Sequence, residues 1–457
     1  MRDWDSARIA EATGATLARL RAPSGDGPGP TRAVIDSRAV EPGDLFVGLP
    51  GSRVDGGAFA ERALAEGAWG VVVQPQWQDA AMRGGAGAVL LADDPVRALG
   101  ALARAWRREL GAQIIAVTGS VGKTSTKDII AALARPHRRT VASRANFNTE
   151  IGLPLEVLAA PAGTQLLILE LAMRGAGQIA ELTDICEPDV GVITNIAPVH
   201  VEQLGSLEGV ARAKAELLVG MRAGTHAIVP AGEALLHSWL RDELEITRFG
   251  EGGEVDWAPG GEGRRILTPD GEVEVELGFT QRHQLRNSLA AVAAVLAVGI
   301  RPSGRVEVVF SALRGEQVEL PGGIRLINDC YNANPLSMRA ALDDLAAQRS
   351  TGRRLAVLGD MLELGADEKR LHLEIGEHAA ASGVQELITV GPRARTMADA
   401  FRGRVHSVED SRQAADRLHA LLREGDVVLV KGSRGVALEV VAEELLARMG
   451  TASGVSA

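Results

Sequence analysis

Residues 116–126 read "AVTGSVGKTST", and this stretch decides the class of fold. An apolar run precedes it and predicts a strand, and a helical pattern follows it. Gly119 and Gly122 allow the backbone to turn its N–H groups towards an anion, and the following helix adds the positive end of its dipole. In such a loop Lys123 reaches the β- and γ-phosphates of a nucleotide, and the Thr124 hydroxyl holds Mg²⁺. The stretch therefore predicts a nucleotide-binding α/β unit.

The spacing of the glycines in this loop is unusual. The common phosphate loop has a glycine five residues before the glycine of "GK", but Val117 occupies that position, so the loop is the shorter G-x-x-G-K-T. A glycine turn beside a chance lysine is the alternative, which the flanking strand and helix disfavour. The sequence contains no guanine-specific "NKxD" motif and no helicase signature. The loop alone therefore leaves motors, switches, kinases and ligases open.

Length and composition indicate a multidomain globular protein. The 457 residues predict about two to four domains, and 46% apolar with 24% charged residues is ordinary. The net charge of −10 disfavours nucleic acid as the main partner, because a phosphate backbone requires a basic face. Cys186 and Cys330 lie in apolar or mixed stretches, so we expect buried free thiols in a reducing cytosol.

Two further stretches bear on location. The N-terminal "MRDWDSARIAEATGA" carries charge throughout, so it is not a secretory signal. The longest apolar stretch, 289–300, is too short to span a bilayer and predicts a buried helix. We therefore expect a cytoplasmic protein without a membrane partner.

Short β-branched runs alternate with helical stretches along the chain, which predicts α/β layers with largely parallel sheets. We expect three domains at 1–110, 111–313 and 314–457, the last resembling a Rossmann-like layer. Strands are expected at 32–40, 44–49, 69–74, 113–117, 166–172, 189–196, 226–230, 324–329, 354–360, 386–391 and 426–433. Helices are expected at 95–110, 208–218 and 286–299.

Several polar residues of the second domain follow predicted strands. Glu170 ends a strand where Mg²⁺ would lie beside a phosphate loop, although a structural glutamate fits equally well. His200 follows another strand, and a lone histidine is more often structural than a metal ligand. By spacing alone, Lys214 lies on the solvated face of a helix. His283 and Asn287 share one helix face and either contact a base or cap the helix.

The end of one strand in the third domain is crowded with hydrogen-bonding groups. Asp329, Tyr331, Asn332 and Asn334 follow the strand at 324–329 and precede a helix. Such crowding favours a binding site over a plain turn.

Taken in order, these motifs resemble those of the Mur ligases. The resemblance rests on "TGSVGKTST", "NFNTEIGLP", "LELAMRGAGQI", "TNIAPVHVE", "RHQLRNSLAA", "NDCYNANPLSM", "LGDMLELG" and "VKGSRG", and it extends from residue 36 over nearly the whole chain. Within the family, "YNANP", "GDMLELG" and "KGSRG" resemble the members that add D-alanyl-D-alanine to UDP-N-acetylmuramoyl-tripeptide. The "DNPR" motif of the members that add diaminopimelate or lysine is missing from the sequence.

The resemblance implies an ATP-dependent amide ligase of peptidoglycan synthesis. It also implies a UDP-substrate-binding first domain, an ATPase middle domain, Mg²⁺ and a monomer. The implied ATP contacts are Gly119, Ser120, Val121, Gly122, Lys123, Thr124, Ser125, Asn287, Arg314, Asp329, Tyr331 and Asn332. The implied metal ligands are Thr124, Glu170, His200 and Lys214, with Lys123, His200 and Lys214 as the catalytic set. Asp36, Ser37, Arg38 and Asn334 would contact the substrate.

The resemblance changes the interpretation of Lys214 more than that of any other residue. In this family a lysine in "AKxE" is carbamylated by CO₂, which makes it an anionic ligand able to hold a second Mg²⁺. The chain also departs from the family pattern at Gly57, Thr149 and Asn328, where His, Asn and Asp are common. The alternatives are another Mur ligase with a different amino acid, a folylpolyglutamate-type ligase, or a non-catalytic nucleotide-gated binding protein on the same scaffold.

Overall fold

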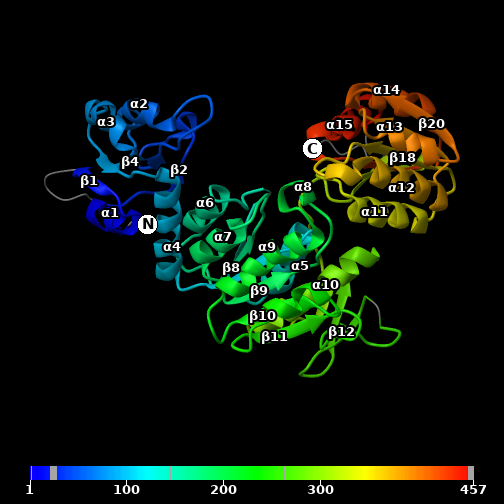
Figure 1. Cartoon of the computed structure of the whole chain (residues 1–457), viewed down its shortest axis with the longest axis horizontal. Helices are drawn as coiled ribbons and strands as arrows, with labels where there is room; N and C mark the ends of the chain where they lie inside the picture. Colours follow the sequence, from blue (N-terminus) through cyan, green and yellow to red (C-terminus); the bar gives the residue numbers. More distant parts are fainter. Residues whose placement is uncertain (2, 21–27, 145, 262, 451–457) are drawn as a thin grey trace.

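The computed structural model describes residues 1, 3–20, 28–144, 146–261 and 263–450. In Figure 1 the first block (blue) and the third block (yellow to red) lie on opposite sides of the middle block (cyan to green). Among the described residues, the first and third blocks contain one sheet each and the middle block contains two. The predicted α/β class is confirmed, whereas the residue boundaries of the three domains stay a prediction.

The first block contains a five-stranded sheet in the order β1-β5-β4-β3-β2. β1 is antiparallel to β5, and the other pairs are parallel. The strands are β1 (Thr16–Arg19), β2 (Ala33–Val34), β3 (Leu45–Val47), β4 (Gly70–Val73) and β5 (Ala88–Leu91). The helices are α1 (Ser6–Thr13), α2 (Ala60–Ala65) and α3 (Gln78–Arg83).

The strand predicted at 32–40 is largely wrong. Only Ala33 and Val34 pair with a neighbouring strand, and a 3₁₀ turn occupies Ser37–Ala39. The Asp36 carboxylate starts this turn by accepting the Arg38 N–H at 3.0 Å. A side chain that caps a turn in this way offers the backbone an alternative to the ladder of a sheet.

Helix α4 (Pro95–Leu110) joins the first block to the middle block and has the predicted bounds. Asp94 caps it by accepting two N–H groups of the first turn at 3.0 and 3.1 Å, and Gly111 ends it with a φ of 61°. Arg107 donates to two backbone carbonyls at the end of α7 (Gln178–Cys186). Apolar residues of both blocks form one continuous core along α4.

The larger sheet of the middle block is parallel throughout, in the order β11-β10-β9-β6-β8-β7. Its strands are β6 (Gln113–Thr118), β7 (Thr140–Ala142), β8 (Leu166–Glu170), β9 (Val190–Ile193), β10 (His226–Pro230) and β11 (Glu245–Phe249). The sheet therefore brings the carboxyl ends of β6, β8 and β9 to one edge, where ligands gather in open α/β sheets.

Helices cover both faces of this sheet. Along β6, Ile115 and Val117 belong to the core formed with α5 (Lys123–Ala134) and α10 (Arg282–Ala297). Ile114 and Ala116 belong to the opposite core, which α4, α6 (Gly152–Ala159), α7 and α9 (Leu207–Gly220) share. Helix α10 begins four residues before the predicted 286.

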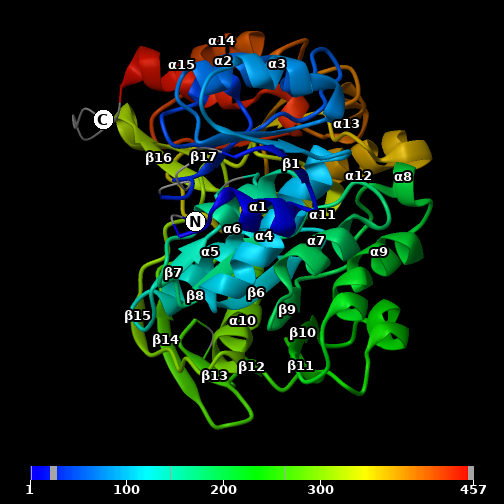
Figure 2. The same cartoon turned by 90° about the vertical axis from the view of Figure 1, so that its left-hand side faces the viewer.

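The second sheet of the middle block is small and lies at the lower edge of both Figure 1 and Figure 2. Its order is β12-β13-β14-β15. The strands are β12 (Asp256–Trp257), β13 (Arg265–Leu267), β14 (Val273–Leu277) and β15 (Gly304–Val306).

The third block contains a six-stranded sheet in the order β16-β17-β21-β18-β19-β20, parallel except for β16. The strands are β16 (Glu316–Leu320), β17 (Ile324–Asn328), β18 (Arg354–Gly359), β19 (Glu386–Val390), β20 (Arg404–Val408) and β21 (Val427–Lys431). One face packs on α11 (Pro335–Ala347), α12 (Glu368–Ala381) and α13 (Arg395–Ala400). The other packs on α14 (Ser411–Leu421) and α15 (Glu439–Met449).

Two smaller expectations concern the cysteines and membranes. Cys186 and Cys330 are buried and free, as predicted. In the part of the chain that the structure describes, no helix is long and apolar enough to cross a membrane.

Candidate active site

The phosphate loop connects the end of β6 to the start of α5, as predicted. Gly119 and Gly122 have φ values of 144° and 80°, which side chains disfavour. A Cβ atom on Gly119 would lie 2.0 Å from Thr194 Oγ1, and one on Gly122 would lie 2.6 Å from Asn287 Oδ1. Both positions therefore require glycine for space as well as for conformation.

The loop after β9 holds the phosphate loop in shape. The Val121 N–H donates to Asn195 Oδ1 at 3.0 Å, and Asn195 Nδ2 donates back to the Val121 carbonyl at 2.9 Å. Ser120 Oγ donates to the Ala197 carbonyl at 3.0 Å and accepts from its N–H at 2.9 Å. These contacts fix the shape of the phosphate loop, and Asn195 contributes two of the hydrogen bonds.

Lys123 is turned back onto its own loop. Its Nζ donates to the carbonyls of Gly119 and Ser120 at 2.9 and 3.4 Å. Burial lowers the pKa of Lys123; the Glu170 carboxylate opposes this effect, and the charge of Arg314 adds to it. Lys123 therefore lies at the centre of the loop, within electrostatic reach of both residues.

Glu170 ends β8 beside the loop and is 2% exposed. Its carboxylate accepts from the Thr124 hydroxyl at 2.6 Å and from Asn148 Nδ2 at 2.9 Å. Its backbone N–H donates to Ser143 Oγ at 3.1 Å, and Lys127 donates to the Ser143 carbonyl at 2.6 Å. Two predicted metal ligands, Thr124 and Glu170, thus touch each other, and Asn148 is a further contact of Glu170 that was not predicted as a site residue.

Lys214 lies inside the protein, so its expected place on a solvated helix face is wrong. It is 1% exposed on α9. Burial holds its pKa well below the usual range, the Lys123 charge lowers that pKa further, and Glu170 and Glu216 oppose both effects. Within the described residues no hydrogen bond or ion pair is found for Lys214 Nζ.

His200 stands just before the short helix α8 (Val201–Leu204) with a φ of 54°. Its Nδ1 lies 2.5 Å from Glu363 Oε2 of the third block. The two atoms do not meet the geometry of a hydrogen bond, and they form an ion pair only when His200 is protonated. Burial lowers the pKa of His200; Glu363 opposes this effect, and Lys214 and Lys123 add to it.

The donor set at these strand ends fits Mg²⁺. No group of three His, Cys, Asp or Glu side chains that could hold a metal lies together in the described part of the chain. Mg²⁺ does not need such a cage, because it keeps several waters and binds one or two carboxylates together with phosphate oxygens. The Thr124 hydroxyl and the Glu170 carboxylate, 2.6 Å apart, supply oxygens of this kind.

Residues of the third block form a second group of contacts. Lys431 Nζ donates to Asp329 Oδ2 at 2.7 Å and to the Asn332 carbonyl at 2.9 Å, which holds the loop after β17. The Arg314 guanidinium lies 4.1 Å from the ring centre of Tyr331. Since Arg314 also affects the pKa of Lys123, this group lies near the phosphate loop.

Two predicted contacts have structural partners. Asn334 caps α11 by accepting the Ser337 N–H at 2.9 Å, and Ser337 Oγ accepts the Asn334 N–H at 3.1 Å. Asn287 lies against Gly122, and its Nδ2 donates to Gln284 Oε1 at 3.2 Å.

The predicted substrate residues of the first block form a separate group. Arg38 donates to both carboxylate oxygens of Asp36 at 2.9 and 2.8 Å, while Ser37 is buried. The hydrogen bonds from the Arg38 side chain, and to a smaller extent the one from its backbone N–H, lower the pKa of Asp36 to about 2. Among the described residues no hydrogen bond or ion pair joins them to the phosphate loop.

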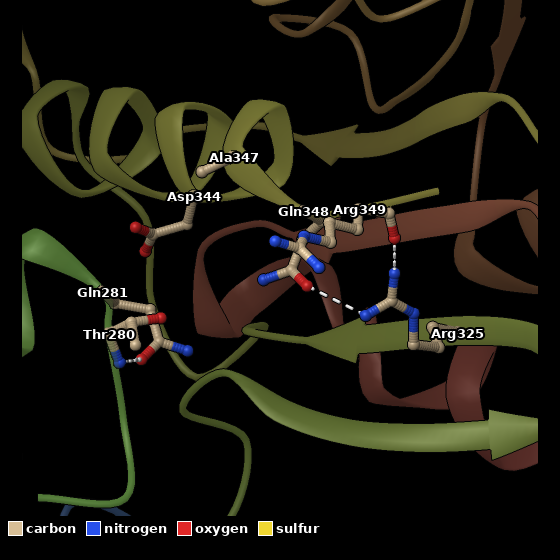
Figure 3. A pocket seen from close by; sticks show the side chains of 7 residues that line it. All are labelled: Thr280, Gln281, Arg325, Asp344, Ala347, Gln348 and Arg349. Atoms are coloured by element: carbon tan, nitrogen blue, oxygen red, sulfur yellow. Dashed lines mark hydrogen bonds between the residues drawn. The ribbon is translucent and has the colours of Figure 1, made fainter. Parts of the chain in front are cut away.

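A cavity of about 320 Å³ lies elsewhere, between Thr280 and Gln281, which directly precede α10, and residues of the third block. Figure 3 shows Gln281 and Asp344 on one side of it and Arg325 with Gln348 on the other. None of the predicted site residues lines this cavity, so volume alone does not identify the site.

Comparisons with known proteins find Mur ligase relatives along most of the chain. The family model for the Mur ligase middle domain matches 117–295, the Mur ligase glutamate ligase domain matches 313–434, and the Mur ligase family catalytic domain matches 32–107. The chain is 34% identical to the UDP-N-acetylmuramoyl-tripeptide--D-alanyl-D-alanine ligase of Bacillus subtilis, over 90% of this chain and 92% of that protein. It is 33% identical to the Escherichia coli ligase of the same name, over 90% and 91%.

Two solved structures are similar over most of their length. MurF from Acinetobacter baumannii superposes with a TM-score of 0.85 at 27% identity, covering 97% of this chain and 99% of that one. MurF ligase from Thermotoga maritima in complex with ADP has a TM-score of 0.78 at 29% identity, covering 91% and 98%.

Proposed function

This chain belongs to the Mur ligase family, and we propose that it joins D-alanyl-D-alanine to UDP-N-acetylmuramoyl-tripeptide at the expense of ATP. The products are UDP-N-acetylmuramoyl-pentapeptide, ADP and phosphate, in the synthesis of peptidoglycan precursors. The observation that carries the proposal is that Lys123 of the phosphate loop and the buried Lys214 lie within electrostatic reach of each other and of the buried Glu170. Such a site attracts the negative charge of a phosphorylated carboxylate.

The reaction proceeds in two steps. A terminal carboxylate oxygen of the tripeptide attacks the γ-phosphorus of ATP, ADP leaves, and an acyl phosphate forms. The amine of D-alanyl-D-alanine then attacks the acyl carbon, loses a proton, and phosphate is expelled from the tetrahedral intermediate. Negative charge gathers at each stage, so the protein contributes positioning and electrostatic stabilisation.

The phosphate loop binds ATP in this proposal. The backbone N–H groups of Gly119, Gly122 and Ser125 are the proposed donors to the phosphates. Ser120 and Val121 are held in place by hydrogen bonds to the loop after β9. Lys123 exchanges its carbonyl partners for the γ-phosphate, which removes the unfavourable burial of an unneutralised charge. Mg²⁺ use belongs to the same proposal, with Thr124, Glu170 and His200 as protein ligands, and the ion neutralises phosphate charge when bound.

Lys214 is proposed to react with CO₂. Its lowered pKa favours the neutral amine, which is the nucleophilic form. The nitrogen lone pair forms a bond to the carbon of CO₂, one C–O π bond breaks, and the nitrogen releases a proton to give a carbamate. The new anion would compensate Lys123 and supply oxygen ligands for a second Mg²⁺.

The remaining residues have proposed contacts with the two substrates. Arg314, Asp329, Tyr331 and Asn332 face the nucleotide from the third block, and Asn287 contacts adenine. Asp36, Ser37 and Arg38 contact the UDP-linked substrate in the first block. Because Asn334 Oδ1 is used by the helix cap, its proposed substrate contact uses the Nδ2 group. A monomer in the cytoplasm is part of the same proposal.

Phosphate release tests the proposal. ATP, UDP-N-acetylmuramoyl-tripeptide and D-alanyl-D-alanine are supplied together and then omitted one at a time. We expect release only with all three. Release that ignores the dipeptide would refute the proposal, and release with single amino acids only would favour another Mur ligase activity. Nucleotide binding without any release would favour a binding protein.

A further inference from the structure

Glu363 meets His200 where the middle and third blocks come together. Glu363 lies between β18 and the 3₁₀ turn at Gly365–Asp367, and that turn contacts α8 directly after His200. Figure 1 shows α8 on the side of the middle block that faces the third block. The 2.5 Å approach of Glu363 Oε2 to His200 Nδ1 is therefore a contact between two blocks.

The backbone of both residues is unusual. His200 has a φ of 54° and Glu363 a φ of 62°, and neither is a glycine. Side chains disfavour this left-handed region, and such conformations persist where the surrounding structure requires them, often at functional sites. The two conformations aim two side chains at each other from separate blocks.

The contact uses only one nitrogen of the imidazole. Nδ1 faces Glu363, and no partner of Nε2 is found among the described residues. Histidines that bind metals commonly direct one ring nitrogen at a carboxylate, which selects the tautomer and the orientation of the ring. At 2.5 Å, Glu363 Oε2 is within reach of a proton on Nδ1.

We propose that Glu363 is a positioning residue of the third block, which orients the His200 ring and leaves Nε2 as its metal-binding atom. The inference rests on the proposed function, because that function makes His200 a ligand of Mg²⁺. Its consequence is that the complete metal site forms only when the third block is in place. Metal affinity thereby becomes dependent on the arrangement of the blocks.

A second histidine–carboxylate pair bridges the same two blocks and supplies the matched control. His283 Nδ1 on α10 lies 2.9 Å from Asp344 Oδ2 on α11. Asp344 lines the cavity of Figure 3, apart from the phosphate loop. If Glu363 only joins the blocks, Asp344→Asn will have the same effect as a change of Glu363.

The test measures Mn²⁺ binding to the full chain with a non-hydrolysable ATP analogue, by electron paramagnetic resonance. We expect Glu363→Ala to weaken Mn²⁺ binding about 10- to 100-fold, as for other outer-shell carboxylates. Glu363→Gln keeps a hydrogen-bond acceptor and should lose less. Asp344→Asn should bind Mn²⁺ like the wild type, and all variants should bind the analogue equally when metal is chelated.

Steady-state kinetics separate this inference from the proposed function. In Glu363→Ala the Mg²⁺ concentration for half-maximal phosphate release should rise more than the maximal rate falls. Unchanged Mn²⁺ binding in Glu363→Ala, or an equal loss in Asp344→Asn, would overturn the inference while the ligase activity stands. A wild type whose phosphate release does not depend on D-alanyl-D-alanine would overturn the proposed function instead.

Discussion

Buried charges in the third block are paired, whereas Lys123 and Lys214 near the phosphate loop have no ionic partner among the described residues. Arg353 donates to Asp426 and Glu386 at 2.8 Å each, and Lys431 lies 2.7 Å from Asp329. Lys214 is 1% exposed and has no ionic partner in the described part of the chain, and Lys123 donates to backbone carbonyls of its own loop. An unpaired buried charge is unfavourable, so binding of an anion would stabilise the lysines of the middle block. The cations of the third block already have carboxylate partners within their own block. Lys214→Ala and Lys431→Met test this difference directly, whereas Gly122→Ala tests the phosphate loop and Arg38→Ala tests an exposed pair of the first block.

Lys214→Ala should have the largest effect. It removes the proposed carbamate and should lower turnover about 10³-fold, in the range found for loss of one transition-state contact. A short carboxylic acid such as acetate should restore part of the activity by supplying an oxygen ligand. Phosphate release is the measurement, and Arg212→Ala, an exposed change on the same helix, is the control. Wild-type activity in Lys214→Ala would remove Lys214 from the site.

Lys431→Met should act on stability first. It leaves Asp329 and the Asn332 carbonyl without their partner, and since Asp329 is 26% exposed we expect a loss of about 2 kcal/mol in the free energy of unfolding. Urea unfolding measures the loss, with the exposed Lys369→Met as the control. An unchanged midpoint would show that the paired charge contributes nothing measurable.

Gly122→Ala should weaken nucleotide binding about 10-fold. The new Cβ would meet Asn287 Oδ1 at 2.6 Å at a φ of 80°, and the left-handed conformation alone costs about 1–2 kcal/mol for a side chain. Gly224 has a similar φ of 75°, and a Cβ there would have no neighbour within 4 Å. Gly224→Ala is therefore the control for the conformational cost of a side chain in the left-handed region. Calorimetric titration with ADP compares the two, and equal affinities would refute the clash.

Arg38→Ala should have the smallest effect, because the Asp36–Arg38 pair is exposed. The pKa of Asp36, held at about 2 by Arg38, should return towards its ordinary value in an NMR titration. A lowered folded-state pKa stabilises the fold above the unfolded carboxyl pKa, and this contribution is lost as the pH falls towards 2. The variant should lack that dependence. A pKa that stays near 2 would show that Arg38 is not its cause.

Local patterns predicted much of the fold. Helix α4 has the predicted bounds because Asp94, Pro95 and Gly111 mark its ends in the sequence. The strand at 226–230 is also confirmed. β1, β5 and β7 were missed because they are short and lack a strong alternating pattern. At 32–40 the Asp36 side chain caps a 3₁₀ turn that takes the place of most of the predicted strand. A count of β-branched residues does not detect such a cap.

The candidate site was predicted less completely. The contact between Thr124 and Glu170 joins residues 46 positions apart, and the strand-end rule anticipated it. Asn148, Asn195 and Glu363 were not anticipated as partners, because their importance depends on which loops the sheets bring together. Asn334 and Asn287 carry structural contacts that residue type alone does not distinguish from ligand contacts.

The sequence by itself determined the phosphate loop, the alternation of strands and helices, and the family, because these depend on residues that are neighbours in the chain. Only the tertiary structure decided that Lys214 is buried with no hydrogen bond or ion pair to any described residue, that Glu170 accepts from the Thr124 hydroxyl, and that Glu363 reaches His200. The physical reason is that burial and electrostatic neighbours depend on packing between distant segments. Spacing along one helix could place Lys214 on a face, but it could not say what would cover that face.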